Sequence, residues 1–172
     1  MARLPSLGMM KDSEDDLTLR GWTEIAYFAL MSWNIRPSQS FATVAIVAER
    51  LCEQMDLTPE KMIEYLKNRG CRIGGITMGE KGLLWYDETG SVHSLPAMPI
   101  PRGRVIDTNG AGDVFHGAYI YSYLAHPGKS WHEHFDFARA ASTHKIQRLG
   151  NEAGLPTLAD IEKVRQEFEV TV

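Results

Sequence analysis

The run of small residues Asn109-Gly110-Ala111-Gly112 constrains the fold of this chain more than any other sequence feature. It follows the segment Arg104–Asp107, which we predict as a strand, and precedes an apolar helical stretch from Asp113 to about Leu124. A strand, a glycine loop and a helix in succession leave backbone N–H groups exposed at the helix N-terminus. Such groups bind anions, so we expect a phosphate-like group to bind here.

The rest of the chain has the pattern of an α/β fold. The apolar run Ile25–Trp33 and the segment Arg72–Met78 predict strands buried on both faces, which are typical of parallel sheets covered by helices. The segments Leu83–Asp87 and Ser91–Leu95 predict a hairpin. Helices are predicted over Ser40–Met55, after the N-cap Thr58, from the capping box at Ser130 to about Arg148, and after Thr157.

Composition and length predict one globular domain spanning residues 1–172, with residues 1–21 as a loose arm. The chain has 18 Lys and Arg against 22 Asp and Glu, and its net charge of −4 gives no reason to expect a nucleic acid or an anionic membrane as partner. The uncharged stretch Ile25–Ile35 is too short to span a bilayer. The first residues lack an apolar signal core, so we expect a cytoplasmic protein.

The carboxylate of Asp113 follows the glycine loop directly. Glycines allow close approach of a phosphoryl group, and first-turn N–H groups stabilise the charge that develops on its oxygens. A carboxylate beside a polyphosphate is unfavourable unless it has a task, and accepting a proton from an attacking hydroxyl is such a task. The alternative is that Asp113 is only a helix N-cap.

A second glycine turn contains Thr77, Gly79 and Gly82 and follows the predicted strand Arg72–Met78. Ligands of open α/β sheets bind where loops leave the carboxyl ends of strands. The turn is therefore a second candidate binding loop, although a tight turn without a ligand explains the same residues.

These motifs resemble a known family. The run DTNGAGDVFHGA, residues 107–118, resembles the C-terminal signature of the ribokinase/PfkB carbohydrate kinases, and the turn at Thr77 is similar to that family's second nucleotide turn. The resemblance extends from about Cys71 to Phe168 and is thinner from Trp22 to Gly70. Further matching segments are Phe137–Ala141, Arg148–Gly150 and Leu155-Pro156.

The resemblance implies a three-layer α/β/α ribokinase-like fold and ATP-dependent phosphoryl transfer to a hydroxyl of a sugar-like small molecule. It makes Asp113 the catalytic base. The anion hole would consist of Gly110, Ala111 and Gly112; the ATP site would include Thr77, Gly79, Gly82, Asn109 and the helix of Arg139. A monovalent cation such as K⁺ would lie near Asp107, Asn109, Arg148 and Gly150.

The chain also departs from this family. Members are about twice as long and have an N-terminal sugar-binding half with a lid, which is not recognisable here, so we expect a truncated form. The family commonly has a Glu that organises Mg²⁺ where this chain has Pro37. Two alternatives to an active kinase stay open: a nucleotide-binding remnant without turnover, and a half-enzyme that needs a partner, such as a second copy, to supply the missing half.

Overall fold

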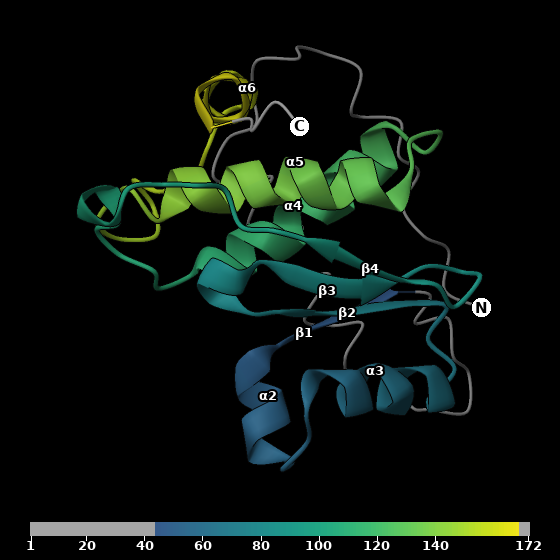
Figure 1. The fold of residues 1–172 in the computed structure, drawn as a ribbon. Helices are drawn as coiled ribbons and strands as arrows, with labels where there is room; N and C mark the ends of the chain where they lie inside the picture. The colour runs from purple at the N-terminus through teal and green to yellow at the C-terminus, as the bar shows by residue number, and fades with distance from the viewer. Residues whose placement is uncertain (1–43, 169–172) are drawn as a thin grey trace, which may run out of the picture.

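The computed structural model describes residues 44–168 (Figure 1). The strands and helices follow in the order β1 (Val44–Ala48), α2 (Glu49–Gln54), α3 (Pro59–Asn68), β2 (Ile73–Thr77), β3 (Leu83–Tyr86), β4 (Val92–Leu95), α4 (Ala111–Ala125), α5 (Trp131–Lys145) and α6 (Leu158–Phe168). Short 3₁₀ turns over Gly79–Lys81 and Arg102–Arg104 interrupt the connections.

The four strands form one mixed sheet in the order β1-β2-β3-β4. Strand β1 runs parallel to β2, with Ala48 opposite Thr77, whereas β3 and β4 continue the sheet as antiparallel neighbours. The carboxyl ends of β1 and β2 therefore meet at one edge of the sheet. In α/β folds this is the edge where ligands bind.

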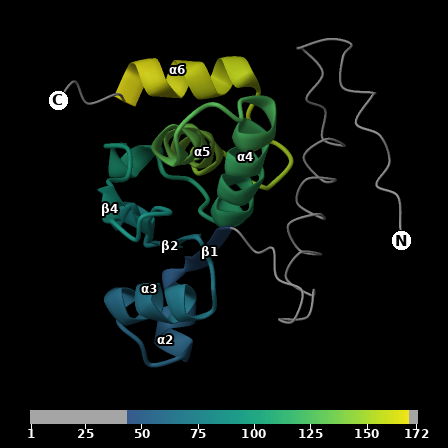
Figure 2. The ribbon, with the colours of Figure 1, turned by 90° about the vertical axis from the view of Figure 1, so that its right-hand side faces the viewer.

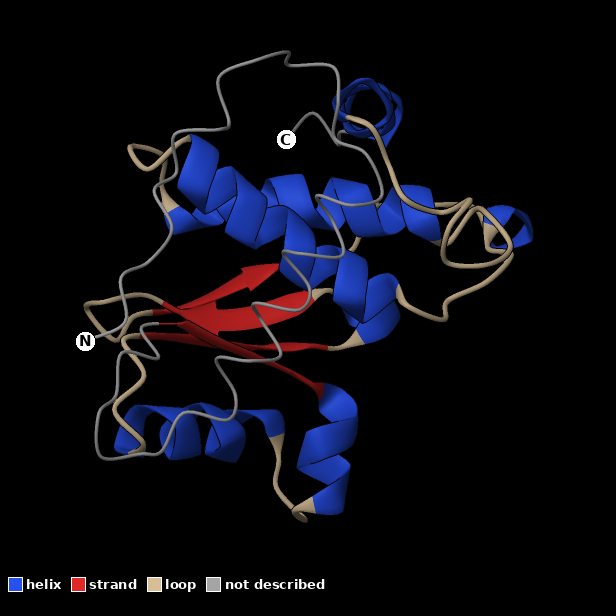
Figure 3. Cartoon of the chain, turned by 180° about the vertical axis from the view of Figure 1, so that it is seen from behind, coloured by secondary structure: helices blue, strands red, loops and turns tan. Residues whose placement is uncertain are grey.

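Helices cover both faces of this sheet (Figures 1 and 3). Helices α2 and α3 lie on one face, α4 and α5 lie on the other, and α6 packs on the outer side of α5 (Figure 2). Two apolar cores result. One, around Phe115 and Phe135, fills the space between the sheet and α4 and α5. The other, around Met62 and Ile76, lies beneath α3.

Local signals for several elements are confirmed. The side chain of Thr58 accepts a hydrogen bond from the N–H of Lys61 and caps α3, and Ser130 forms the predicted capping box with Glu133 at the start of α5. The predicted hairpin is present as β3 and β4. Helix α5 ends at Lys145, three positions before the predicted end, and the chain turns there toward α6.

Two predictions were wrong. Residues Val44–Ala48, predicted within a helix, form strand β1, because their β-branched side chains fit the sheet and their backbone pairs with β2. The predicted strand Arg104–Asp107 does not form. Instead the N–H groups of Ile106 and Asp107 both donate to the carbonyl oxygen of Ile146, and Ile106 is 60% exposed.

Some predictions lie outside the described residues: the loose arm 1–21, the strand Ile25–Trp33 and Pro37. Within residues 44–168, no helix combines the length and the apolar character that crossing a bilayer would require.

Candidate functional site

A cavity of about 830 Å³ opens at the sheet edge where β1 and β2 end. This volume falls in the range of small-molecule sites. Its walls come from the ends of β1 and β2, the loop after β4, the first turn of α4 and the last turns of α5. Six of the residues predicted for binding line this one cavity: Thr77, Gly79, Gly82, Ala111, Gly112 and Arg139.

The turn after β2 is shaped by its glycines. The N–H of Met78 donates to the carbonyl of Gly82 at 2.8 Å, and Gly82 has a φ of +91°. A Cβ on Gly82 would lie 2.2 Å from the carbonyl oxygen of Leu95, so only glycine lets the turn close against β4. Gly79 also has a positive φ, of +55°, but open space surrounds it on the cavity side.

The glycine loop begins α4 in the predicted way. Gly110 is the N-cap with a left-handed φ of +74°, and a Cβ there would lie 2.4 Å from Oδ1 of Asn151. The N–H of Ala111 donates to Thr108, so Gly112 and Asp113 contribute the next N–H groups of the first turn. A helix start leaves such groups without an intrahelical acceptor, which makes this turn suited to an anion.

Asp113 is the third residue of α4 and is exposed. It is not the N-cap, because Gly110 holds that position, so capping does not account for this carboxylate. Asp113 does not line the cavity itself and lies one residue beyond Gly112, which does. Its side chain is exposed to solvent at the first turn of α4.

Arg139 lines the cavity and also holds one of its walls in place. Its Nη1 atom donates to the carbonyl oxygen of Pro96 at 2.8 Å, and its Nη2 atom pairs with Asp136. It thereby anchors the loop after β4, whose residues Met98 and Ile100 form an apolar wall. This wall was not predicted from the sequence, in which the prolines of the loop are its one local signal.

Ser142 was also missed. It lies on the cavity wall, and its hydroxyl donates to the carbonyl of Ala111 at 3.1 Å, which fixes α5 against the start of α4. A serine on a helix carries no sequence signal of such a role, because the contact joins residues that are far apart in the chain.

The residues predicted around a monovalent cation lie beside the glycine loop. Oδ1 of Asp107 accepts from the N–H of Asn109 and Oδ2 accepts from the N–H of Gly150, both at 2.9 Å. These two hydrogen bonds, in that order, and then Lys145 lower the pKa of Asp107. The guanidinium of Arg148 turns away and donates to the carbonyl of His144.

This donor set does not fit a monovalent cation. The ammonium of Lys145 already contacts the carbonyl oxygen and Oδ2 of Asp107, at 3.2 and 3.3 Å, and Gly150 presents an N–H to the carboxylate rather than an oxygen. The described residues also contain no group of three His, Cys, Asp or Glu side chains arranged to hold a metal ion.

The chain resembles known proteins over most of the described region. A ribokinase of Lactococcus lactis is 27% identical over 126 residues, which are 72% of this chain and 39% of that protein. The crystal structure of a ribokinase from Thermotoga maritima has a TM-score of 0.63 and 26% identity over 72% of this chain and 42% of its own. The chain thus spans about two fifths of the length of these relatives.

A third relative has been solved with its ligands. The structure of Arabidopsis thaliana ribokinase complexed with ribose and ATP matches 61% of this chain and 32% of its own, with 26% identity and a TM-score of 0.54. The model of the pfkB family of carbohydrate kinases matches residues 47–158, which include both glycine turns and every residue that lines the cavity. The chain therefore belongs to the pfkB carbohydrate kinase family.

Proposed function

We propose that this chain carries the nucleotide site and the catalytic base of an ATP-dependent carbohydrate kinase, folded as one domain. One observation carries the proposal: a single cavity brings together Thr77, Gly79, Gly82, Ala111, Gly112 and Arg139, which come from three separate parts of the chain. A ribokinase of similar sequence was solved with ribose and ATP, which supports a sugar as acceptor and ATP as donor.

The roles follow from the geometry. ATP lies in the cavity between the Thr77–Gly82 turn and α5, with its phosphates toward the N-terminus of α4. The N–H groups of Gly112 and Asp113 stabilise the charge on the oxygens of the moving phosphoryl group. The Asp113 carboxylate accepts the proton of the sugar hydroxyl as that oxygen attacks the γ-phosphorus, the bond from the γ-phosphorus to the bridging oxygen breaks, and ADP leaves.

Mg²⁺ accompanies ATP in this proposal. It prefers water and phosphate oxygens to an all-protein cage, and it shields charge between the β- and γ-phosphates. No cluster of protein ligands is needed for that role.

A second function is a nucleotide-binding protein without turnover, or one that turns over only beside a partner. The observation that favours it is the exposure of Asp113 to solvent. An exposed base in water loses much of the advantage of a closed site, because water competes with the sugar hydroxyl for the phosphoryl group.

The test combines binding with turnover. Thermal unfolding is followed during a titration with Mg²⁺ and ATP, and ADP release is then assayed with a panel of sugars that includes ribose. We expect ATP to raise the Tm, and sugar-dependent ADP release to disappear in Asp113→Asn while the ATP-induced rise in Tm persists. Asp56→Asn, on the loop between α2 and α3, is the matched control.

Each outcome separates the readings. ATP binding without sugar-dependent ADP release favours the nucleotide-binding protein, and release that appears only on adding a second polypeptide favours the half-enzyme. Turnover by Asp113→Asn equal to that of the unmodified chain overturns the base assignment. No effect of ATP on the Tm overturns the nucleotide site.

A further inference from the structure

A fully buried lysine lies behind the glycine loop. Lys145 is the last residue of α5, its side chain is 0% exposed, and its Nζ atom lies 3.2 Å from the carbonyl oxygen and 3.3 Å from Oδ2 of Asp107. Lysine is rarely buried, because removing an ammonium group from water is costly unless a partner compensates for it. Here the partner is a carboxylate whose side chain is itself only 20% exposed.

The fold leaves a space shaped for the lysine stem. A Cβ built on the buried residue Gly154 would lie 2.1 Å from Cδ of Lys145 and 3.0 Å from its Cε. Glycine at position 154 is therefore what lets the methylene chain pass toward Asp107. The backbone of Gly154 has no positive φ, so the requirement for glycine comes from contacts rather than from the conformation: chiefly the Lys145 stem, and also the carbonyl oxygen of Gly150 at 3.1 Å.

Asp107 connects Lys145 to the glycine loop and to the turn after α5. Its Oδ1 atom accepts from the N–H of Asn109, next to the N-cap Gly110, and its Oδ2 atom accepts from the N–H of Gly150. On the far side, Gly110 packs against the side chain of Asn151. The glycine loop and the turn after α5 are thus joined through one carboxylate and one ammonium group.

We infer that Lys145 is a built-in counterion: its ammonium takes the place of a monovalent cation beside the glycine loop, so this site works without K⁺. It neutralises Asp107, holds the loop in its anion-binding conformation, and puts a positive charge near the phosphates. Lys145 is a positioning residue, because its contacts are with Asp107 and not with the cavity. The inference rests on the proposed function only where ATP binding is measured.

The first test uses the unmodified chain. Its Tm without nucleotide, and its affinity for Mg²⁺ and ATP, are measured in KCl, NaCl and choline chloride at equal ionic strength. We expect the same Tm and the same affinity in all three salts, because the ammonium is already in place. A rise in Tm or in affinity that is specific to K⁺ overturns the inference. The Tm needs no nucleotide, so failure of ATP binding alone leaves this test intact.

The second test removes the ammonium group beside Asp107 and asks whether a small cation can replace it. In choline chloride, Lys145→Ala is expected to lower the Tm by about 4–10 °C and to weaken ATP binding on the order of tenfold. K⁺, NH₄⁺ or ethylammonium is expected to restore much of that Tm, because a small cation enters the space left by the side chain, whereas choline is too large. Lys163→Ala, an exposed lysine on α6, is the control and should show no cation selectivity.

A double variant keeps the inference testable through stability alone. Gly154→Ala is expected to destabilise the chain strongly when Lys145 is present. It should cost less in the Lys145→Ala background, where only the carbonyl oxygen of Gly150, 3.1 Å away, still crowds the Cβ. Equal effects of Gly154→Ala in both backgrounds, or a Lys145→Ala variant as stable as the unmodified chain with no response to small cations, overturns the inference.

Discussion

The Nε2 atom of His116 lies 2.9 Å from the backbone carbonyl oxygen of Ile46, across a sequence separation of 70 residues. On the other side of the same ring, Nδ1 lies 2.7 Å from the carbonyl oxygen of Gly112. Carbonyl oxygens only accept hydrogen bonds and a neutral imidazole has one N–H, so the ring donates to one of these two oxygens at a time. One side chain on α4 thereby lies between strand β1, at the edge of the described sheet, and the glycine loop.

Removing this ring should loosen both elements. We expect His116→Ala to lower the free energy of unfolding by about 1–3 kcal/mol, because the hydrogen bond of the ring is lost and the ring leaves a gap beside Tyr119. ATP affinity should fall as well, since Gly112 lies in the same contact. Chemical denaturation and an ATP titration measure the two effects. His132→Ala, an exposed histidine on α5, is the control, and equal losses in the two variants would contradict this role.

The two glycines of the turn after β2 should respond differently to alanine. In Gly82→Ala, a φ of +91° and a Cβ 2.2 Å from the carbonyl oxygen of Leu95 combine, so we expect a loss of about 3 kcal/mol or more. In Gly79→Ala, the φ of +55° acts alone because nothing lies within 4 Å, and the loss should be about 1–2 kcal/mol. Urea unfolding of both variants gives the comparison.

For Gly79→Ala, the loss of ATP affinity should be larger than the small loss of stability suggests. Gly79 lines the cavity, and no atom lies within 4 Å of a Cβ built there. Gly79→Ala therefore tests whether a ligand approaches this backbone closely, with little damage to the fold. We expect its ATP affinity to drop more than its stability does. An unchanged affinity in Gly79→Ala would mean that the phosphates do not pass over this turn.

The sequence predicted features that depend on neighbouring residues. Thr58 and Ser130 cap their helices, and Gly110 opens α4, because these choices are made within a few positions of the chain. Strand β1 could not be predicted in this way. Its five residues also suit the apolar face of a helix. Pairing with β2, which follows α3 in the chain, is what makes them a strand rather than a helix.

Lys145 shows the same limit within the site. A lysine near a helix C-terminus ordinarily stands in solvent and interacts with the helix dipole. Its burial depends on Asp107, 38 positions earlier, and on the missing side chain at Gly154. The sequence therefore indicated Asp107. That Lys145 is its partner follows only from the folded structure, in which the glycine loop and the turn after α5 lie together.

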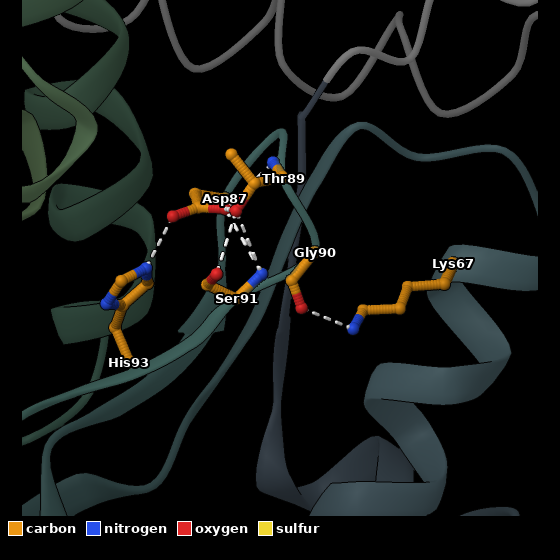
Figure 4. A network of polar contacts seen from close by, with 6 residues as sticks. All are labelled: Lys67, Asp87, Thr89, Gly90, Ser91 and His93. Atoms are coloured by element: carbon orange, nitrogen blue, oxygen red, sulfur yellow. Dashed lines mark hydrogen bonds and ion pairs between the residues drawn. The ribbon is translucent and has the colours of Figure 1, made fainter.

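The hairpin between β3 and β4 carries a pH-sensitive group. Figure 4 shows the Asp87 carboxylate accepting hydrogen bonds from Thr89, Ser91 and His93. The hydrogen bond from the Thr89 hydroxyl, and then that from His93, holds the pKa of Asp87 well below its ordinary value. A carboxyl group whose pKa is lower in the folded state stabilises the fold above its unfolded pKa, near 4, and loses that contribution as the pH falls toward the folded value.

Asp87→Asn should therefore reveal this contribution through pH. We expect the unmodified chain to be more stable than Asp87→Asn at about pH 6, and the difference to shrink steadily as the pH falls below about 4. Urea unfolding at a series of pH values measures the difference. Asp56→Asn provides the reference for an exposed aspartate, and a difference for Asp87→Asn that stays constant down to about pH 3 would contradict the assignment.

Arg139 allows a direct comparison between binding a ligand and shaping its cavity. Its Nη1 atom donates to the carbonyl of Pro96 while Nη2 pairs with Asp136, an arrangement that needs two nitrogens at fixed positions. Lysine keeps the charge but has one nitrogen, so Arg139→Lys should release the loop that carries Met98 and Ile100. We expect ATP affinity to fall about tenfold and hydrogen exchange to rise in residues 96–101. Arg72→Lys, at an exposed ion pair, is the control. If affinity falls while exchange in this loop is unchanged, Arg139 contacts the nucleotide directly, and the loop does not depend on it.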